Sequence, residues 1–191
     1  MSKPIRTALL GGTFNPLHNG HLTIARSVLQ QGLADEVWML ITPCNPCNPW
    51  KKDQDLPDDR IRYNMVAEAV KNMEHVFASD YEFNLPKPSY TANTLRHIST
   101  DHPDREFILT IGADNWVKFD NWRESEFILN NYHIIVYPRK GYDIKNTPEG
   151  IHLLECPLVD ISSTQIRQMI KNGEPIGELV PASVARIIVS L

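Results

Sequence analysis

The sequence contains little cysteine, no long hydrophobic run and no strong excess of either charge. Its 3 cysteines among 191 residues are too few, and odd in number, for a disulfide framework. No apolar run approaches the roughly 20 residues that span a bilayer, and the first ten residues are too interrupted for a signal-peptide core. We therefore expect reduced thiols, no membrane partner and a cytoplasmic location.

The net charge of −4 is too small and of the wrong sign for a general electrostatic grip on nucleic acid, so no nucleic-acid partner is expected. Any anionic ligand must be held by local geometry. Hydrophobic residues make up 42% and charged residues 22%, which is typical of a soluble globular protein. The length predicts one domain over residues 1–191.

The pair Cys44 and Cys47, in the segment CNPC, invites a zinc or redox interpretation. A structural zinc site needs four ligands, and the chain has no second pair with suitable spacing. Pro43 and Pro46 favour an irregular segment over a thioredoxin-like helix start. Simple loop cysteines are the favoured interpretation, and no residue of the chain is predicted to ligate a metal directly.

Short apolar runs alternate with helical patterns along the chain, which is typical of βαβ units. Strands are expected at 7–10, 36–41, 76–79, 106–112 and 132–138, with an edge strand at 152–156. Helices are expected at 21–32, 58–72, 89–99, 122–131, 162–173 and 181–191. This alternation implies an α/β fold, an open parallel sheet with helices on both faces. Such sheets bind ligands at the carboxyl ends of their strands.

The segment Gly11–His21, GGTFNPLHNGH, joins the first expected strand to the first expected helix, where phosphates bind in such folds. Its leading glycine pair lets the backbone approach a ligand, Pro16 stiffens the turn, and Gly20 removes bulk where the helix begins. His18 and His21 lie three apart and should point the same way. The spacing fits neither GxGxxG nor the P-loop, so imidazoles take the place of a P-loop lysine.

A second segment, ISSTQIR at Ile161–Arg167, has the pattern of a helix start. Ser163 and Thr164 would occupy the first turn and Arg167 would lie one turn further. Backbone N–H groups, hydroxyls and a guanidinium could then share a triphosphate. Alone the segment would be an ordinary helix cap, but its pairing with the histidine turn favours a functional interpretation.

These two segments carry a family resemblance. GGTFNPLHNGHL resembles the HxGH signature of the nucleotidyltransferase superfamily related to class I tRNA synthetases, and ISSTQIR resembles its second signature. Between them NPWKK, SYTANTL, IGADNWVKFDNW and YPRKG follow in the order and approximate spacing seen in bacterial nicotinate mononucleotide adenylyltransferases. The resemblance spans essentially the whole chain. It implies a Rossmann-like doubly wound fold, use of ATP and Mg²⁺, and transfer of adenylate to nicotinate mononucleotide, forming deamido-NAD.

The resemblance also implies roles for particular residues. The expected catalytic residues are His18, His21, Lys52 and Arg167. The expected ATP-binding residues are Gly11, Gly12, Thr13, Phe14, Gly20, Gly112, Asp114, Arg139, Ile161, Ser162, Ser163 and Thr164. The expected residues for the mononucleotide are Asn15, Lys51, Tyr90, Thr91, Trp116 and Trp122.

Three of these assignments keep an alternative. The family often has a histidine before its lysine, where this chain has Lys51, so either Lys51 or Lys52 could contact phosphate. Trp122 corresponds to the aromatic residue that stacks on the pyridine ring, with Trp116 as a rival that could instead pack in the core. Asp114 could hold a ribose hydroxyl or a metal-bound water, or it could cap a helix.

The implied chemistry needs no general base, because the attacking phosphate is already ionised near neutral pH. It needs in-line positioning and neutralisation of charge on the α-phosphate and the departing pyrophosphate. Two alternatives stay open: a phosphopantetheine adenylyltransferase-like enzyme, which would not require the central motifs, and a non-catalytic ATP-binding module. The sequence leaves the oligomeric state open, a homo-oligomer included.

Overall fold

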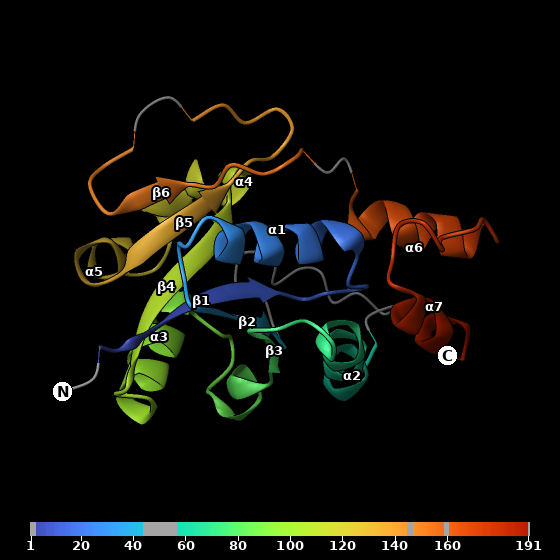
Figure 1. Ribbon diagram of the computed structural model, residues 1–191, viewed down its shortest axis with the longest axis horizontal. Coiled ribbons are helices and arrows are strands. Elements are labelled where there is room, and N and C mark those ends of the chain that lie inside the picture. Colours follow the sequence, from blue (N-terminus) through green and yellow to red (C-terminus); the bar gives the residue numbers. More distant parts are fainter. Residues whose placement is uncertain (1–2, 44–56, 145–146, 159–160, 191) are drawn as a thin grey trace.

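The computed structural model describes residues 3–43, 57–144, 147–158 and 161–190 (Figure 1). Its strands form one sheet in the order β3-β2-β1-β4-β5-β6, and every neighbouring pair is parallel. The strands are β1 (Ile5–Gly12), β2 (Glu36–Ile41), β3 (Val76–Ser79), β4 (Arg105–Gly112), β5 (His133–Tyr137) and β6 (Ile151–Leu153). This is the doubly wound Rossmann order, in which strands are added first to one side of β1 and then, from β4 onward, to the other side, and a ligand crevice forms between β1 and β4.

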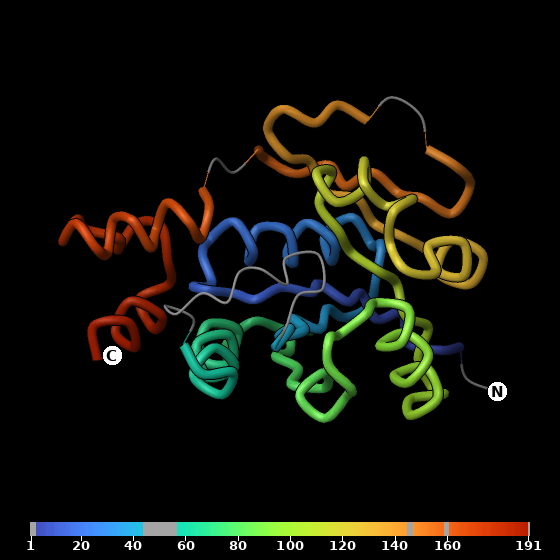
Figure 2. The backbone as a smooth tube through the Cα atoms, turned by 180° about the vertical axis from the view of Figure 1, so that it is seen from behind, coloured from blue at the N-terminus to red at the C-terminus, as the bar shows by residue number. Residues whose placement is uncertain are grey.

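Helices cover both faces of the sheet. They are α1 (Asn19–Gln30), α2 (Asp59–Val70), α3 (Thr91–Asp101), α4 (Ala113–Trp116), α5 (Ser125–Asn131), α6 (Ser163–Lys171) and α7 (Ala182–Val189), with 3₁₀ turns η1 (Tyr81–Asn84) and η2 (Phe119–Asn121). Buried side chains of α1, α2, α6 and α7 belong to one core cluster, and those of α3 and α5 belong to another. Figure 2, seen from behind, shows α3 and α5 on the side away from α1.

The central strand explains this layering. Ala8 and Leu10 of β1 belong to the cluster under α1 and α2, whereas Leu9 belongs to the cluster under α3 and α5. All three side chains are at most 2% exposed. Because neighbouring residues of a strand point to opposite faces, a continuous apolar run needs cover on both sides. The run TALL therefore predicts the buried position that β1 occupies.

A strand lies at each expected place, although the edge strand expected at 152–156 is the shorter β6, Ile151–Leu153, and the other main differences lie at helix ends. The helix expected from 122 begins only at Ser125, because the backbone of Trp122 is extended and Glu124, the N-cap, has a positive φ of 58°. The helix expected from 181 begins at Ala182, and Pro181 is its N-cap. The helix expected from 58 is α2, with Asp58 as its N-cap, accepting from the backbone N–H of Arg60 at 2.8 Å.

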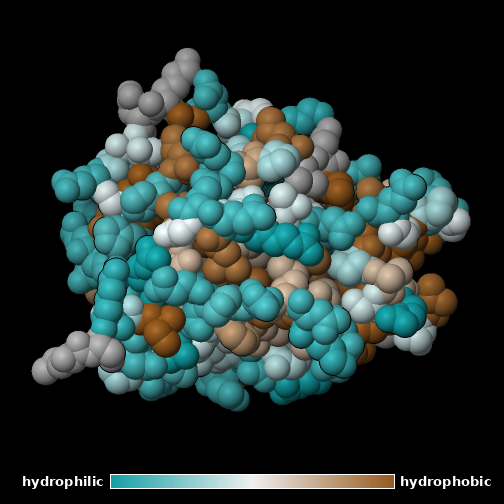
Figure 3. Space-filling view, viewed as in Figure 1, coloured by the Kyte–Doolittle hydropathy of each residue, from teal (hydrophilic) through white to brown (hydrophobic). Residues whose placement is uncertain are grey.

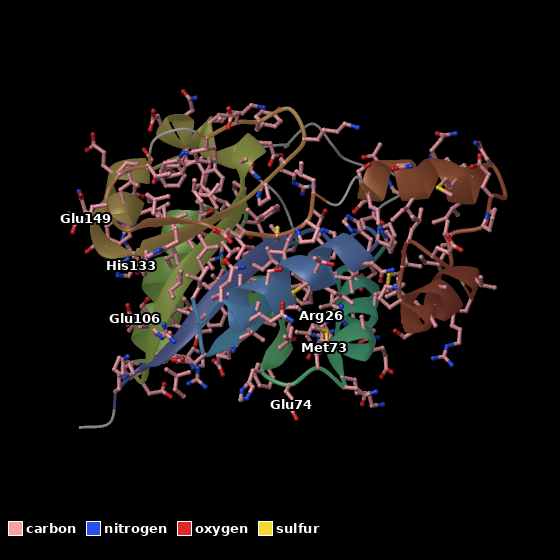
Figure 4. All side chains as sticks on the ribbon, turned by 45° about the horizontal axis from the view of Figure 1, so that its top comes forward. Arg26, Met73, Glu74, Glu106, His133 and Glu149 are labelled. Carbon is pink, nitrogen blue, oxygen red and sulfur yellow. The ribbon has the colours of Figure 1, made fainter. Side chains whose placement is uncertain are left out.

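No helix in the described ranges is both long and apolar enough to cross a bilayer. Figure 3 shows hydrophilic residues over most of one face, with hydrophobic residues scattered between them. Figure 4 shows Arg26 of α1 near Met73, and His133 near Glu106, with 3.9 Å between His133 Nε2 and Glu106 Oε1. His133 begins β5, so this pair lies at the amino ends of the strands, opposite the ligand crevice.

Candidate active site

The histidine turn follows β1 directly and ends in the first turn of α1. His18 is the N-cap of α1 and His21 is its third residue, and their rings stack with centroids 3.7 Å apart. The backbone N–H of His18 donates to Nδ1 of His21 at 3.2 Å. Because Nδ1 accepts this bond, the neutral His21 ring carries its proton on Nε2. His21 can therefore act as a hydrogen-bond donor toward a ligand.

Both imidazoles are held neutral. Burial, with a smaller contribution from the nearby Arg139 charge, lowers the pKa of His18 to about 4. Burial, together with the charges of His18 and Arg139, lowers the pKa of His21 well below its ordinary value. Near neutral pH both rings are therefore uncharged, and they can offer a ligand hydrogen-bond donors but no positive charge.

Helix α6 brings the second segment against the histidine turn. Arg167 donates from Nη1 to the backbone carbonyl of Asn15 at 2.8 Å and from Nη2 to Oγ1 of Thr164 at 3.2 Å. Ser163 donates from Oγ to the backbone carbonyl of Pro16 at 3.0 Å. Figure 1 shows α6 beside the start of α1. Residues about 150 positions apart in sequence thus form one continuous surface.

The start of α6 is itself fixed by a cap. Ser162 is the N-cap and accepts from the backbone N–H of Gln165 at 3.2 Å. Ile161, just before it, lines a hollow of about 20 Å³ together with His18, His21, Gly20 and Arg139. Residues from both sequence segments and from the end of β5 therefore line the hollow.

The end of β4 leaves little room for a side chain at Gly112. A Cβ atom at Gly112 would lie 2.4 Å from Oδ1 of Asp114 and 3.1 Å from Cε2 of Tyr137. Oδ1 of Asp114 lies 3.7 Å from Nε of Arg139, and both atoms are buried without a hydrogen-bond partner in the described ranges. The two atoms form an ion pair with each other and lack hydrogen-bond partners, so Asp114 and Arg139 are candidates for ligand contact at this end of the sheet.

A larger cavity, of about 270 Å³, opens at the carboxyl ends of β1 and β4. Tyr137 lines both this cavity and the small hollow, so the two adjoin. Of the residues predicted from sequence, the cavity is lined by Gly11, Gly12, Tyr90, Thr91 and Trp122. It lies at the topological switch point, where doubly wound sheets bind nucleotides.

Comparisons with known proteins agree with this arrangement. Residues 9–169 match the Cytidylyltransferase-like family. A protein of Bacteroides fragilis named "Probable nicotinate-nucleotide adenylyltransferase" is 41% identical over 96% of this chain and 91% of the relative. A protein of Flavobacterium johnsoniae with the same name is 42% identical over 94% of each chain. This chain belongs to the nicotinate-nucleotide adenylyltransferase family.

Solved structures show the same fold. The Plasmodium falciparum nicotinic acid mononucleotide adenylyltransferase complexed with APC superposes with a TM-score of 0.79 at 20% identity, covering 97% of this chain and 96% of that one. The same Plasmodium enzyme complexed with NaAD gives a TM-score of 0.78. The Rossmann-like fold predicted from the sequence is therefore confirmed.

Arg62 supports the site, although the sequence did not predict that role. Arg62 of α2 is fully buried and donates to three backbone carbonyls: from Nη1 to Thr13 at 2.5 Å and to Thr42 at 3.2 Å, and from Nε to Pro57 at 3.3 Å. It also forms an ion pair with Asp59. Arg62 thus ties the histidine turn to the end of β2 and to the start of α2. Arg62 lies three residues before the buried Met65, and this spacing could have indicated that Arg62 is on the buried face of the helix.

The remaining predicted residues fall into three groups. Both tryptophans pack on Phe119 with ring centroids 5.3 Å away, but only Trp122 lines the cavity, so the geometry favours Trp122 as the ring that meets a substrate. Phe14 is 2% exposed and meets the His21 ring edge-on at 5.0 Å, so it supports that histidine from within. Lys51 and Lys52 lie outside the described residues, as do Cys44 and Cys47.

Proposed function

We propose that this chain transfers the AMP group of ATP to nicotinate mononucleotide, giving deamido-NAD and pyrophosphate in NAD biosynthesis. The observation that carries the proposal is the contact between Arg167 of α6 and the Asn15 carbonyl of the histidine turn. It supports one anion site built from both sequence segments, beside a cavity lined by Trp122. Family membership supports the choice of acceptor.

In this reaction a phosphate oxygen of the mononucleotide attacks the α-phosphorus of ATP, and the bond to pyrophosphate breaks. The attacking oxygen is already ionised, so the site has to orient it and stabilise charge. We propose that the neutral imidazoles of His18 and His21 donate hydrogen bonds to the phosphate groups. Their rings are stacked, so protonating both would place two like charges in contact. We assign the triphosphate to Arg167 and the start of α6, with Lys51 or Lys52 as a further cation implied by resemblance.

The chain also fits the magnesium that ATP normally carries. The described residues contain no group of three or more His, Cys, Asp or Glu side chains that could hold a metal ion. Mg²⁺ keeps several waters and is commonly held by phosphates with one or two carboxylates. Asp114, with its buried and unbonded Oδ1, is the residue that would hold such a hydrated ion or a ribose hydroxyl. When bound, the ion would neutralise triphosphate charge.

We assign the acceptor to the larger cavity. Trp122 would stack on the pyridine ring, and the amino end of α3, at Tyr90 and Thr91, would receive its 3-carboxylate. Helix amino ends favour anions, and charge-assisted bonds are about twice as strong as neutral ones. An enzyme with these small-molecule substrates also fits the expected cytoplasmic location.

The test is pyrophosphate release from ATP and Mg²⁺ with nicotinate mononucleotide, nicotinamide mononucleotide or phosphopantetheine as acceptor. We expect release with the nicotinate form, and roughly a hundredfold lower kcat/KM with the amide, since a mismatched buried polar group costs on the order of 1–3 kcal/mol. Release only with phosphopantetheine would favour the related pantetheine enzyme. ATP binding without release for any acceptor would indicate a nucleotide-binding module.

A further inference from the structure

Arg123 occupies a position in the larger cavity that the family resemblance does not explain. It follows Trp122 directly and lines the cavity with it. Its guanidinium carbon lies 4.8 Å from the centre of the Tyr90 ring. Tyr90 is the N-cap of α3, so the guanidinium lies over the residue at which that helix begins.

The charge of Arg123 is poorly satisfied by the protein itself. Its ion-pair partner is Glu124, with 3.8 Å between Nε of Arg123 and Oε1 of Glu124. The same carboxylate binds Arg96 more closely, through both an ion pair and a hydrogen bond. Within the described ranges the Arg123 guanidinium makes no hydrogen bond, and its side chain is 59% exposed. Its donors are therefore free to meet an anion in the cavity.

Other groups around the cavity also favour a negatively charged ligand. The amino end of α3 has no side-chain cap and no acidic residue in its first turn, so its positive end is uncompensated. Ser89 is 5% exposed, and its hydroxyl has no hydrogen-bond partner in the described residues.

The acidic side chain that lines the cavity does not cancel this preference. Glu82 is buried and accepts a hydrogen bond from the Thr94 hydroxyl at 2.7 Å. Burial raises the pKa of Glu82, which disfavours the charged form that would repel an anion. The cavity therefore combines one available cation and one open helix end with a buried carboxyl group that already accepts a hydrogen bond from Thr94.

We propose that Arg123 is a specificity-determining residue, whose guanidinium pairs with the 3-carboxylate of the pyridine ring and selects nicotinate over nicotinamide mononucleotide. The inference rests on the proposed function and extends it to a residue outside the recognised motifs. A carboxylate presents two oxygens to the guanidinium fork, whereas a carboxamide presents one oxygen and an NH₂ group that faces other donors. Arg123 therefore adds to the preference that the α3 backbone already supplies.

The test compares Arg123→Gln with the wild-type enzyme, using ATP with each mononucleotide. Glutamine keeps a polar stem and loses the charge. We expect kcat/KM for the nicotinate form to fall about tenfold through KM, because a charge-assisted bond is lost from a partly exposed site. The amide form should change by less than about twofold, since it makes no such bond. KM for ATP should not change, and Arg123→Lys should restore part of the loss.

Arg60→Gln is the matched control. Arg60 has an exposed fraction of 59%, like Arg123, and also lies over aromatic rings, 5.4 Å from the centres of Tyr63 and Phe83. It does not line the cavity, so its loss should leave the substrate ratio unchanged. An unchanged ratio in Arg123→Gln, or an equal fall for both mononucleotides, would overturn the inference. If the wild-type enzyme releases no pyrophosphate with nicotinate mononucleotide, the proposed function fails instead.

Discussion

The buried guanidinium of Arg62 offers the sharpest test of how the histidine turn is held. In Arg62→Lys the charge remains, but a compact ammonium replaces a planar fork that reaches the carbonyls of Thr13, Thr42 and Pro57. At least two of these acceptors should lose their donor, at about 1–3 kcal/mol each. We expect unfolding free energy to fall by about 3 kcal/mol, which for a chain of this size lowers Tm by roughly 6–12 °C.

The same change should reduce activity beyond what instability alone explains, because the turn that carries His18 loses an anchor at Thr13. Urea unfolding and kcat with saturating substrates measure the two effects separately. Met65→Ala is the control for destabilisation: Met65 is 2% exposed on the same helix, and its truncation costs about 2–5 kcal/mol without touching the turn.

We expect kcat to fall about tenfold or more in Arg62→Lys, because displaced catalytic groups react more slowly. In folded Met65→Ala we expect kcat to fall less than about twofold. Arg60→Lys, at an exposed neighbour, should change stability by less than about 1 kcal/mol. Equal kcat in Arg62→Lys and Met65→Ala would refute the anchoring role. A stability loss in Arg62→Lys no larger than in Arg60→Lys would refute the energetic reasoning.

Three further predictions concern the site itself. His21→Ala should lower kcat by roughly a hundredfold while leaving the circular dichroism spectrum unchanged, since it removes a preorganised donor; near-normal turnover would return His21 to a packing role. The folded pKa of His18, about 4, lies below its unfolded value, so the unfolded chain binds the proton first as pH falls, and stability is lost between about pH 6.5 and 4. Relative to His18→Asn, the wild-type protein should lose about 2 kcal/mol of unfolding free energy from pH 7 to pH 5 in denaturant titrations; parallel curves would contradict the neutral buried ring. Trp122→Ala should raise KM for both mononucleotides and leave KM for ATP nearly unchanged; a selective effect on ATP would place the ring elsewhere.

Much of the fold could be predicted because its strands are continuous apolar runs buried on two faces. The β1 run and the glycine-rich turn after it carry their structure in local sequence. The segment from Ala113 to Asn121 does not, because α4 and η2 are too short to show a helical period. The conformation of this region determines whether Trp116 or Trp122 can stack on a substrate ring. Both pack on Phe119, and only the folded structure shows that Trp122, and not Trp116, lines the cavity.

The two arginines that add most to the site were not predicted, for different physical reasons. Arg62 is buried by contacts with residues up to 49 positions away, and a charged residue in a helix ordinarily indicates a solvated face. Arg123 follows Trp122, but its side chain is available to a ligand only because Glu124 is already paired with Arg96. Hydrophobic periodicity predicts neither the burial of Arg62 nor the pairing of Glu124 with Arg96, because both depend on contacts between residues far apart in the sequence.

The most direct test of the account is identification of the products formed from ATP, Mg²⁺ and nicotinate mononucleotide, by mass spectrometry of the nucleotides and by parallel measurement of pyrophosphate. The account predicts deamido-NAD and pyrophosphate in equal amounts, with the α-phosphate of ATP retained in the dinucleotide. Formation of AMP and pyrophosphate without the dinucleotide, or of ADP and phosphate, would contradict adenylyl transfer.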